Sequence, residues 1–235
     1  MFEGKRKALT FSYDDGTTQD IRLIEIFNKY GLKATFNLNS ELLGEVNSFD
    51  INGKEINHTK NKPEDIRRIY KGHEVAVHTL THPKLTEIES NDEVLRQVEE
   101  DRRNLSELVG YEVKGMAYPC GGVNCNDRVA DIIRTNTPIK YARTTAVTHS
   151  FIPDTELFQF KGTVYHHRDW DVLFDLGRKF IESESDEPQL FYIWGHSFEF
   201  DIYPDRWDGF EEFCKMMSNR NDIYYASNIE ALGKF

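Results

Sequence analysis

The chain has 235 residues, with 29 lysines and arginines against 40 aspartates and glutamates, so its formal net charge is −11. Hydrophobic residues make up 39% and aromatic residues 13% of the chain, which excludes a disordered protein and is enough for a sizeable core. An acidic surface repels phosphate, and since basic residues form no strong cluster, nucleic-acid binding is excluded as well.

The sequence also bears on location and redox chemistry. No stretch is long and apolar enough to cross a bilayer. Residues 1–10 lack the apolar core of a secretory signal, which favours a cytoplasmic protein, although a signal trimmed beforehand would leave the same appearance. The cysteines Cys120, Cys125 and Cys214 are too few for a disulfide framework, and their spacing does not fit a structural zinc knuckle.

No repeat, low-complexity tract or linker divides the chain, so we predict one domain over residues 1–235. Short apolar runs alternate with longer amphipathic segments. The elements predicted in the first half are strand 7–13, helix 18–30, strand 33–38, a short helix from Pro63 that ends before Gly72, strand 73–77 and a helix from Ser90 to Gly110. The polar segment 39–62 is expected to be a long loop or small insertion.

The second half continues the same alternation. The predicted elements are strand 113–118, helix 127–135, strands 141–145 and 158–165, helix 170–183, strand 189–194, helix 206–218, strand 223–225 and a closing helical turn 228–232. The repeated order of strand and then helix predicts an α/β fold with a parallel sheet, either open or closed into a barrel.

Several predicted strands end in residues that a hydrophobic core would not select. These ends carry Asp14-Asp15-Gly16, His78-Thr79-Leu80-Thr81-His82-Pro83, Pro119-Cys120-Gly121-Gly122 and Gly195-His196-Ser197. In parallel α/β folds such ends lie on one face, where active sites are built. Each motif alone has a structural explanation, such as a turn or a helix cap. Four of them on one face indicate an active site.

The residue types in these motifs fit metal-assisted hydrolysis. Two histidines four residues apart can present nitrogen to one cation, and a carboxylate can supply a third ligand. Three protein ligands leave positions open for water and substrate. The second carboxylate of an adjacent pair can act as general base, and a distant histidine can protonate the leaving group. A backbone N–H after a proline-containing turn can share a developing oxyanion.

The motifs resemble those of the NodB-homology polysaccharide deacetylases, carbohydrate esterase family four. The family's Thr-Phe-Asp-Asp-Gly motif corresponds to residues 12–16, and its His-Ser/Thr-x-x-His motif to residues 78–82. The resemblance extends from Lys7 to about Leu232 in the family's order. It implies a distorted (β/α) barrel, usually seven-stranded.

The resemblance also implies roles for individual residues. Asp15, His78 and His82 would bind the metal, usually zinc in this family, although cobalt, nickel or iron also suit two histidines and a carboxylate. Asp14 would be the general base and His196 the general acid. In the turn formed by Pro119, Cys120 and Gly121, the backbone N–H of Cys120 would contribute to the oxyanion site.

The sequence departs from the family pattern at two places near the expected substrate. The third motif usually reads Arg-x-Pro-Tyr/Phe-Gly, but here it begins with Ala117 and has Cys120 in place of the aromatic residue. The arginine that normally orients the base is therefore absent from this motif. Trp194 stands where a leucine usually shapes the acetyl pocket, and we expect it to narrow that pocket.

The fourth motif, an aspartate and a tryptophan that support the acid histidine, is matched only loosely. The candidates for this support are Asp169, Trp170 and Asp171, with Asp201 as a third possible carboxylate partner. His166 and His167 are expected to be surface residues at a strand end.

Three functional hypotheses follow. The leading one is a metal-dependent hydrolase that removes N-acetyl, or O-acetyl, groups from a carbohydrate. The second keeps fold and metal but acts on a small cytoplasmic amide or acetylated sugar, as the missing arginine and Trp194 suggest. The third is an inactive carbohydrate-binding relic, which ranks lowest because ligands, base and acid are all retained. Segment 39–62 is the expected place for substrate specificity, and the sequence leaves the oligomeric state open.

Overall fold

The computed structural model describes residues 2–233, so Met1, Lys234 and Phe235 lie outside the described residues. Within that range, nine strands form one sheet in which the paired strands run parallel, and this confirms the α/β class. The strands are β1 (Lys7–Asp14), β2 (Ala34–Leu38), β5 (Glu74–Val77), β6 (Gly115–Ala117), β7 (Tyr141–Val147), β8 (Phe160–Gly162), β9 (Val164–Tyr165), β10 (Gln189–His196) and β11 (Ile223–Tyr225).

The sheet closes into a barrel through one bent segment, residues 160–165. The strand order is β8-β7-β6-β5-β2-β1-β10-β9, so β8 and β9, which are consecutive in the chain, stand at its two ends. Between them the backbone N–H of Thr163 donates to Tyr192 O of β10 at 2.8 Å. With 160–165 counted as one strand, seven strands surround the barrel, as the family resemblance implied, and β11 is an additional strand beside β1.

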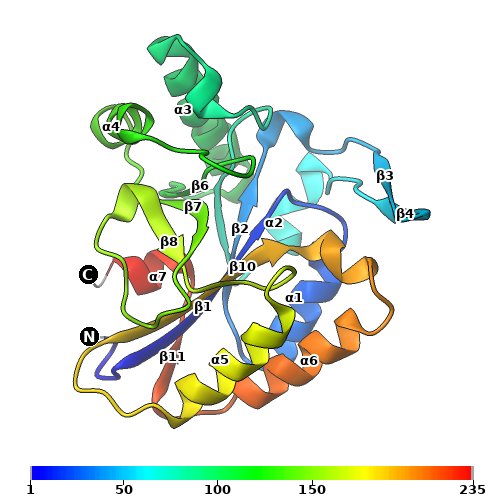
Figure 1. Ribbon diagram of the computed structural model, residues 1–235. Coiled ribbons are helices and arrows are strands. Elements are labelled where there is room, and N and C mark those ends of the chain that lie inside the picture. The colour runs from blue at the N-terminus through cyan, green and yellow to red at the C-terminus, as the bar shows by residue number, and fades with distance from the viewer. Residues whose placement is uncertain (1, 234–235) are drawn as a thin grey trace.

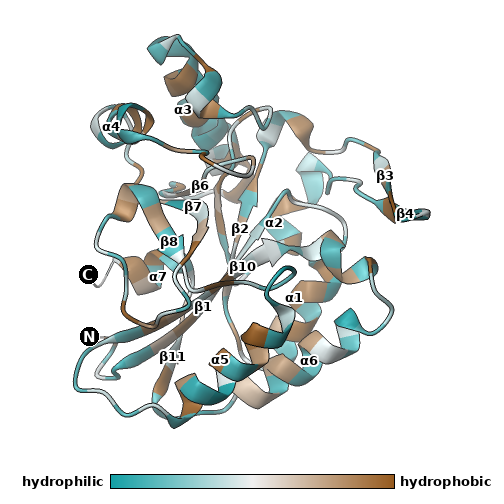
Figure 2. Cartoon of the chain, viewed as in Figure 1, coloured by the Kyte–Doolittle hydropathy of each residue, from teal (hydrophilic) through white to brown (hydrophobic). Residues whose placement is uncertain are grey.

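Helices cover the outside of the barrel. Figure 1 shows α1 (Asp20–Lys29), α5 (Trp170–Glu182) and α6 (Arg206–Met217) together on one side, and α3 (Asn91–Val109) beside α4 (Asp127–Asn136) on another. These helices carry both hydrophobic and hydrophilic residues (Figure 2), as expected for helices with one buried face. No helix in residues 2–233 has the length and apolar character needed to span a membrane.

The ends of α3 show how the sequence defines a helix. The Ser90 hydroxyl accepts a hydrogen bond from the backbone N–H of Glu93 at 3.3 Å, which satisfies one of the free N–H groups of the first turn. Gly110 ends the helix with a φ of 81°, a left-handed conformation that glycine adopts without steric cost. Both features were predicted from the sequence.

The core next to β1 is aromatic. Phe11 of β1 is fully buried, and its ring lies 4.6 Å from that of Phe27 in α1 and 6.1 Å from that of Phe210 in α6, measured between centroids. Burying each such side chain contributes roughly 1.5–3 kcal/mol. This packing fixes the strand that ends in Asp14.

The segment 39–62, expected to be a loop or small insertion, is folded. It contains a short 3₁₀ helix (Ser40–Leu42) and an antiparallel hairpin of β3 (Ser48–Ile51) and β4 (Lys54–Asn57), which projects from the barrel in Figure 1. Two short α-helices are α2 (Ile66–Ile69) and α7 (Asn228–Leu232). Further 3₁₀ helices span Pro63–Asp65, Leu85–Glu87, Leu157–Gln159 and Ser197–Asp201.

Candidate active site

The motifs singled out in the sequence meet at one pocket of about 400 Å³. Asp14 and His196 are the last residues of the neighbouring strands β1 and β10, and they are paired in register. The pocket is also lined by His78, which follows β5, and by Cys120, which follows β6. The carboxyl ends of four parallel strands therefore supply the site, as the topology requires. A larger depression near Lys5 lies at the other end of β1, away from this chemistry.

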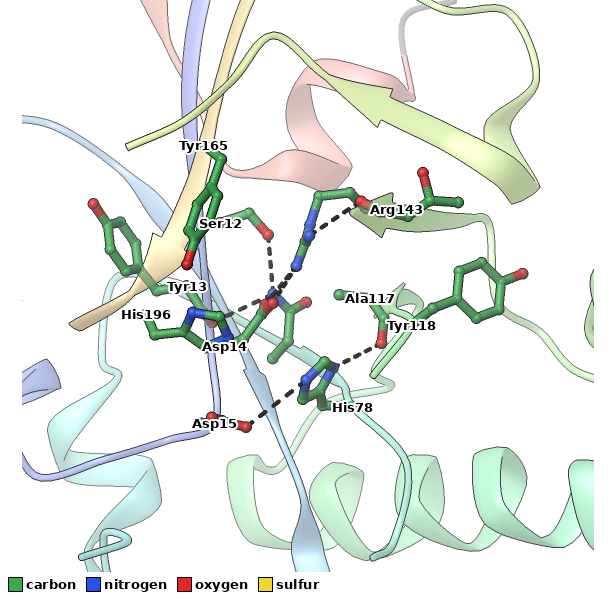
Figure 3. A network of polar contacts seen from close by, with 12 residues as sticks. Ser12, Tyr13, Asp14, Asp15, His78, Ala117, Tyr118, Arg143, Tyr165 and His196 are labelled. Carbon is green, nitrogen blue, oxygen red and sulfur yellow. Dashed lines mark hydrogen bonds and ion pairs between the residues drawn. The ribbon is translucent and has the colours of Figure 1, made fainter. Parts of the chain in front are cut away.

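The three predicted metal ligands are gathered at one side of this pocket. One ligand atom from each of Asp15, His78 and His82 lies within 4.8 Å of the others. Oδ1 of Asp15 is 3.8 Å from Nε2 of His78 and 3.6 Å from Nε2 of His82. Nδ1 of His78 lies 2.8 Å from the Ala117 carbonyl oxygen, which orients Nε2 towards the carboxylate (Figure 3). A backbone acceptor on the second ring nitrogen is the usual arrangement for a histidine that binds a metal.

The protonation states of these groups suit cation binding. Burial lowers the pKa of His78 to about 4 and also lowers that of His82, so both imidazoles are neutral near pH 7. Burial by itself raises the pKa of Asp15, but the hydrogen bond with His58 and the charge of Lys60 hold that pKa well below its ordinary value. A carboxylate and two neutral imidazoles form the donor set that a divalent cation needs.

Unusual backbone conformations are concentrated at the site. Asp15, Thr79, His82 and Cys120 have φ angles of 82°, 69°, 60° and 66°. Non-glycine residues seldom adopt this left-handed region, and for a β-branched residue such as Thr79 it is a genuine outlier. Such strain persists only where the surrounding structure holds it, and it is typical of functional sites.

Asp14 is held by a buried arginine that sequence reasoning did not identify. Nη2 of Arg143, from β7, lies 2.6 and 2.5 Å from the two carboxylate oxygens of Asp14, and both side chains are almost fully buried. The Asn37 amide donates a third hydrogen bond to Asp14 Oδ1 at 2.8 Å. Figure 3 shows this group next to His196. Asp14 is therefore oriented by an arginine of β7, although the third motif has Ala117 in place of arginine.

The charge of Arg143 sets the ionisation of this carboxylate. Burial by itself raises the pKa of Asp14, but the nearby Arg143, with smaller contributions from His78 and His196, lowers it below the ordinary value. The guanidinium also lies over the ring of Trp194, 4.5 Å from its centroid. Asp14 is thus an ionised carboxylate with a fixed orientation.

His196 has a carboxylate partner three residues further along the chain. Its Nδ1 lies 3.2 Å from Oε1 of Glu199, and the other oxygen of Glu199 lies 3.1 Å from Nε2 of His166. The Tyr165 hydroxyl donates to Glu199 as well. Burial opposes the charged form of His196, but Glu199 outweighs it and raises the pKa of His196 to about 9.

The expected partners of His196 are engaged elsewhere, so Glu199 replaces them. Asp169 pairs with Arg168 at 3.0 Å and with His149 at 3.2 Å. Asp201 accepts hydrogen bonds from Trp207 Nε1 at 2.8 Å and from Gln19 at 2.7 Å. Trp170 packs under the guanidinium of Arg206, and Asp171 is exposed on the first turn of α5.

The expectation that His166 and His167 are surface residues is wrong for His166. Its side chain is buried, and it stacks on Phe200 with ring centroids 4.4 Å apart. The close approach of this ring explains Gly195, because a Cβ there would lie 1.7 Å from Cδ2 of His166. The glycine before His196 is therefore required by packing.

The remaining predicted residues form the wall of the pocket. Cys120, Gly121 and Trp194 line it, whereas Pro119 is buried outside the lining. Trp194 is almost fully buried and stacks on Tyr165, with ring centroids 4.2 Å apart and an interplanar angle of 9°. This pair gives the pocket a flat aromatic side.

Comparison with known proteins agrees with this geometry. Residues 3–137, more than half of the chain, match the family model described as polysaccharide deacetylase. The chain belongs to the polysaccharide deacetylase family. Comparison with curated protein sequences gave no significant match.

Solved structures of this family share the fold. The peptidoglycan deacetylase PdaC from Bacillus subtilis is 21% identical, with a TM-score of 0.56 over 97% of this chain and 92% of that one. A family 4 acetyl xylan esterase from Clostridium thermocellum, solved with a cobalt ion, is 14% identical, with a TM-score of 0.60 over 97% and 91%. A pseudoenzyme of the same family from Bacillus anthracis is 18% identical, with a TM-score of 0.59 over 97% and 66%.

Proposed function

We propose that this protein is a metal-dependent hydrolase that removes N-acetyl groups from a carbohydrate and releases acetate. The observation that carries the proposal is the arrangement around one pocket. A cation-binding set (Asp15, His78 and His82) lies beside an ionised carboxylate, Asp14, and a histidine with a raised pKa, His196. Family membership supports the class of substrate.

The donor set fits a divalent cation such as zinc or cobalt. Asp15, His78 and His82 would hold it, and the Ala117 carbonyl would keep His78 in the tautomer whose Nε2 is free to bind. A cation held there would polarise the acetyl carbonyl and make bound water more acidic. Three protein ligands leave room for substrate and water, which is typical of catalytic sites.

The base and the acid divide the proton transfers between them. Asp14, ionised and oriented by Arg143, accepts a proton from the attacking water as its oxygen bonds to the acetyl carbon. His196, which carries a proton up to about pH 9, gives that proton to the amide nitrogen as the carbon–nitrogen bond breaks. The products are acetate and a free amine.

Two further groups act on the reacting acetyl. Cys120 lines the pocket, and its backbone N–H would donate to the carbonyl oxygen as negative charge develops on it. The stacked rings of Trp194 and Tyr165 provide an apolar surface against which an acetyl group or a sugar face can pack. The reach of Trp194 into this pocket supports, as a second candidate, a short or monomeric acetylated substrate in place of a polymer.

The proposal is tested by acetate release. Metal-loaded protein is incubated with N-acetylglucosamine, with its short oligomers and with an insoluble N-acetylated polymer, before and after chelation. We expect acetate from at least one of these, loss of release on chelation and recovery on adding Zn²⁺ or Co²⁺. A preference for the insoluble polymer would reject the small-substrate candidate. No acetate from any of them, with metal bound, would reject the enzymatic proposal in favour of a binding role.

A further inference from the structure

Two basic residues that follow the hairpin reach the carboxylate of Asp15 from outside the pocket. Nε2 of His58 lies 3.1 Å from Oδ2 of Asp15, and Nζ of Lys60 lies 3.6 Å from Oδ1. The Lys60 side chain is 5% exposed, so its ammonium is largely removed from water. Neither residue belongs to the predicted ligand set, and neither lines the pocket.

Backbone hydrogen bonds fix this segment against the turn that carries Asp15. The N–H of Thr18 donates to Thr59 O at 2.9 Å, and the N–H of Asn61 donates to Gly16 O at 2.9 Å. Thr17 and Lys60 form an isolated antiparallel bridge. These contacts hold the segment that follows β4 beside the turn, and both His58 and Lys60 reach Asp15 from it.

The two residues contact different oxygens of the same carboxylate. An ionised carboxylate only accepts hydrogen bonds, so His58 donates from Nε2 to Oδ2. This leaves Oδ1 directed at Nε2 of His78 and Nε2 of His82, where a cation would bind. Lys60 approaches that same Oδ1.

The Lys60 ammonium therefore competes with a bound cation for one oxygen. In residues 2–233, Asp15 is the only carboxylate within 4.0 Å of Lys60, so this buried charge depends on Asp15 for its partner. A divalent ion on Oδ1 would share that partner and repel the ammonium across a short, poorly solvated distance.

We infer that His58 and Lys60 act in opposite directions on the metal site: His58 orients Asp15 for the cation, and Lys60 is a built-in competitor that weakens cation binding. The inference rests on the proposed function in that it takes Asp15, His78 and His82 as the ligands. Its consequence is a site that releases its metal more readily than the three ligands alone would.

The test measures metal affinity and not activity. The metal-free full chain is titrated with Co²⁺ against a chromophoric chelator, for the wild type, Lys60→Met, His58→Ala and the exposed control Lys62→Met. We expect Lys60→Met to bind at least about tenfold more tightly, because the repelling charge is gone. We expect His58→Ala to bind about 10–100-fold more weakly, because it loses an outer partner of a ligand. Lys62→Met should match the wild type.

General damage to the segment would shift the Co²⁺ affinity of both variants in the same direction, whereas this inference predicts opposite shifts for Lys60→Met and His58→Ala. Unchanged or weaker binding by Lys60→Met would overturn it, as would unchanged or tighter binding by His58→Ala. Lys60→Gln gives a second neutral side chain should Lys60→Met not fold. His78→Ala, which should abolish binding, assigns the Co²⁺ signal to this site. Absence of Co²⁺ binding by every variant would instead reject the metal-dependent function.

Discussion

A buried arginine outside the recognised motifs, Arg143, holds the carboxylate of Asp14. The third motif begins with Ala117 in place of arginine, yet Asp14 has a buried guanidinium against both of its oxygens. Arg143 lies on β7, which neighbours β6, the strand that leads into the third motif. Its guanidinium approaches Asp14 from within the barrel. This arrangement supports the proposed enzyme over an inactive relic, because Asp14, the proposed base, is ionised and held in one orientation.

We expect Arg143→Lys to lower kcat by about 10²-fold, since the lysine keeps the charge but loses the two-oxygen contact that orients Asp14. Metal content should stay unchanged, because Arg143 donates its hydrogen bonds to Asp14 and to the Thr144 carbonyl and not to the three predicted ligands. Steady-state kinetics together with metal analysis measure both quantities. The exposed Arg134→Lys serves as control, and full activity of Arg143→Lys would contradict the role.

Glu199 should control the alkaline side of the pH–rate profile. Its negative charge raises the pKa of His196 to about 9, so this proposed general acid stays protonated in the wild type up to about that pH. In Glu199→Gln this charge is absent, so the pKa of His196 falls and kcat should decline at a lower pH. The measurement is kcat against pH for both proteins.

A control separates Glu199 from the carboxylates that the sequence had suggested. Asp201→Asn removes a carboxylate two residues further along the chain, which accepts hydrogen bonds from Trp207 and Gln19. Its alkaline decline should coincide with that of the wild type. If Glu199→Gln also declines at the wild-type pH, Glu199 is not the partner of the general acid.

At the residue scale, the sequence predicted the site residues that lie within motifs and missed those that lie outside them. Asp14, Asp15, His78, His82 and His196 were all identified from their strand-end positions, and all line the pocket. Arg143 was missed because its contact with Asp14 depends on how β7 and β1 face each other in the barrel. Glu199 was missed because the 3₁₀ helix Ser197–Asp201, which turns it back towards His196, was not predicted. A signal was present, since an arginine inside the otherwise uncharged strand 141–147 needs a buried counter-charge.

At the scale of elements, the order of strands and helices was predictable because the hydrophobic pattern is strong. The last strand and helix, 223–225 and 228–232, match residue for residue. The predicted strand 158–165 is divided into β8 and β9, because Thr163 marks the place where the chain changes partner from β7 to β10. Pairing of this kind is not encoded in the local pattern.

The hairpin within 39–62 was missed although the sequence carries a turn signal. Asn52 and Gly53 have φ angles of 54° and 80°, which a two-residue hairpin turn requires and which Asn-Gly tolerates well. The flanking strands are mostly exposed, so they lack the apolar alternation by which strands are recognised. The hairpin's place beside the site depends on tertiary contacts such as that between Lys54 and the Asp201 carbonyl.

At the scale of the whole molecule, the net charge is −11, but the carboxylates of the site each have a basic partner. Asp14 faces Arg143, Asp15 faces Lys60, and Glu199 faces two histidines. Exposed ion pairs elsewhere, such as that between Arg6 and Asp186, contribute little stability.

A buried carboxyl at the amino end of β5 should make stability depend on pH. Glu74 accepts hydrogen bonds from Thr35 at 2.7 Å, Tyr141 at 3.0 Å and the Ile229 N–H at 2.9 Å, yet burial raises its pKa to about 7. The folded state therefore binds this proton more tightly than the unfolded state, whose pKa is 4.5. The stabilisation is complete below pH 4.5 and is lost as the pH rises to about 7.

Glu74→Gln cannot ionise, so it should escape this loss. Between about pH 4 and pH 8, the free energy of unfolding of the wild type should fall relative to that of the variant by on the order of 3 kcal/mol. Denaturant unfolding at both pH values gives the difference. Asp20 and Asp101, whose pKa values burial also raises to about 7, are present in both proteins and cancel. A pH-independent difference would contradict the account.

The most direct test of the proposed chemistry compares two substitutions in acetate release and metal content. Asp14→Asn keeps the three predicted ligands but removes the base, so it should retain metal and lose turnover by at least about 10²-fold. His78→Ala removes a ligand, so it should lose both metal and turnover. A fully active Asp14→Asn protein, or a His78→Ala protein that keeps its metal and its activity, would contradict the mechanism.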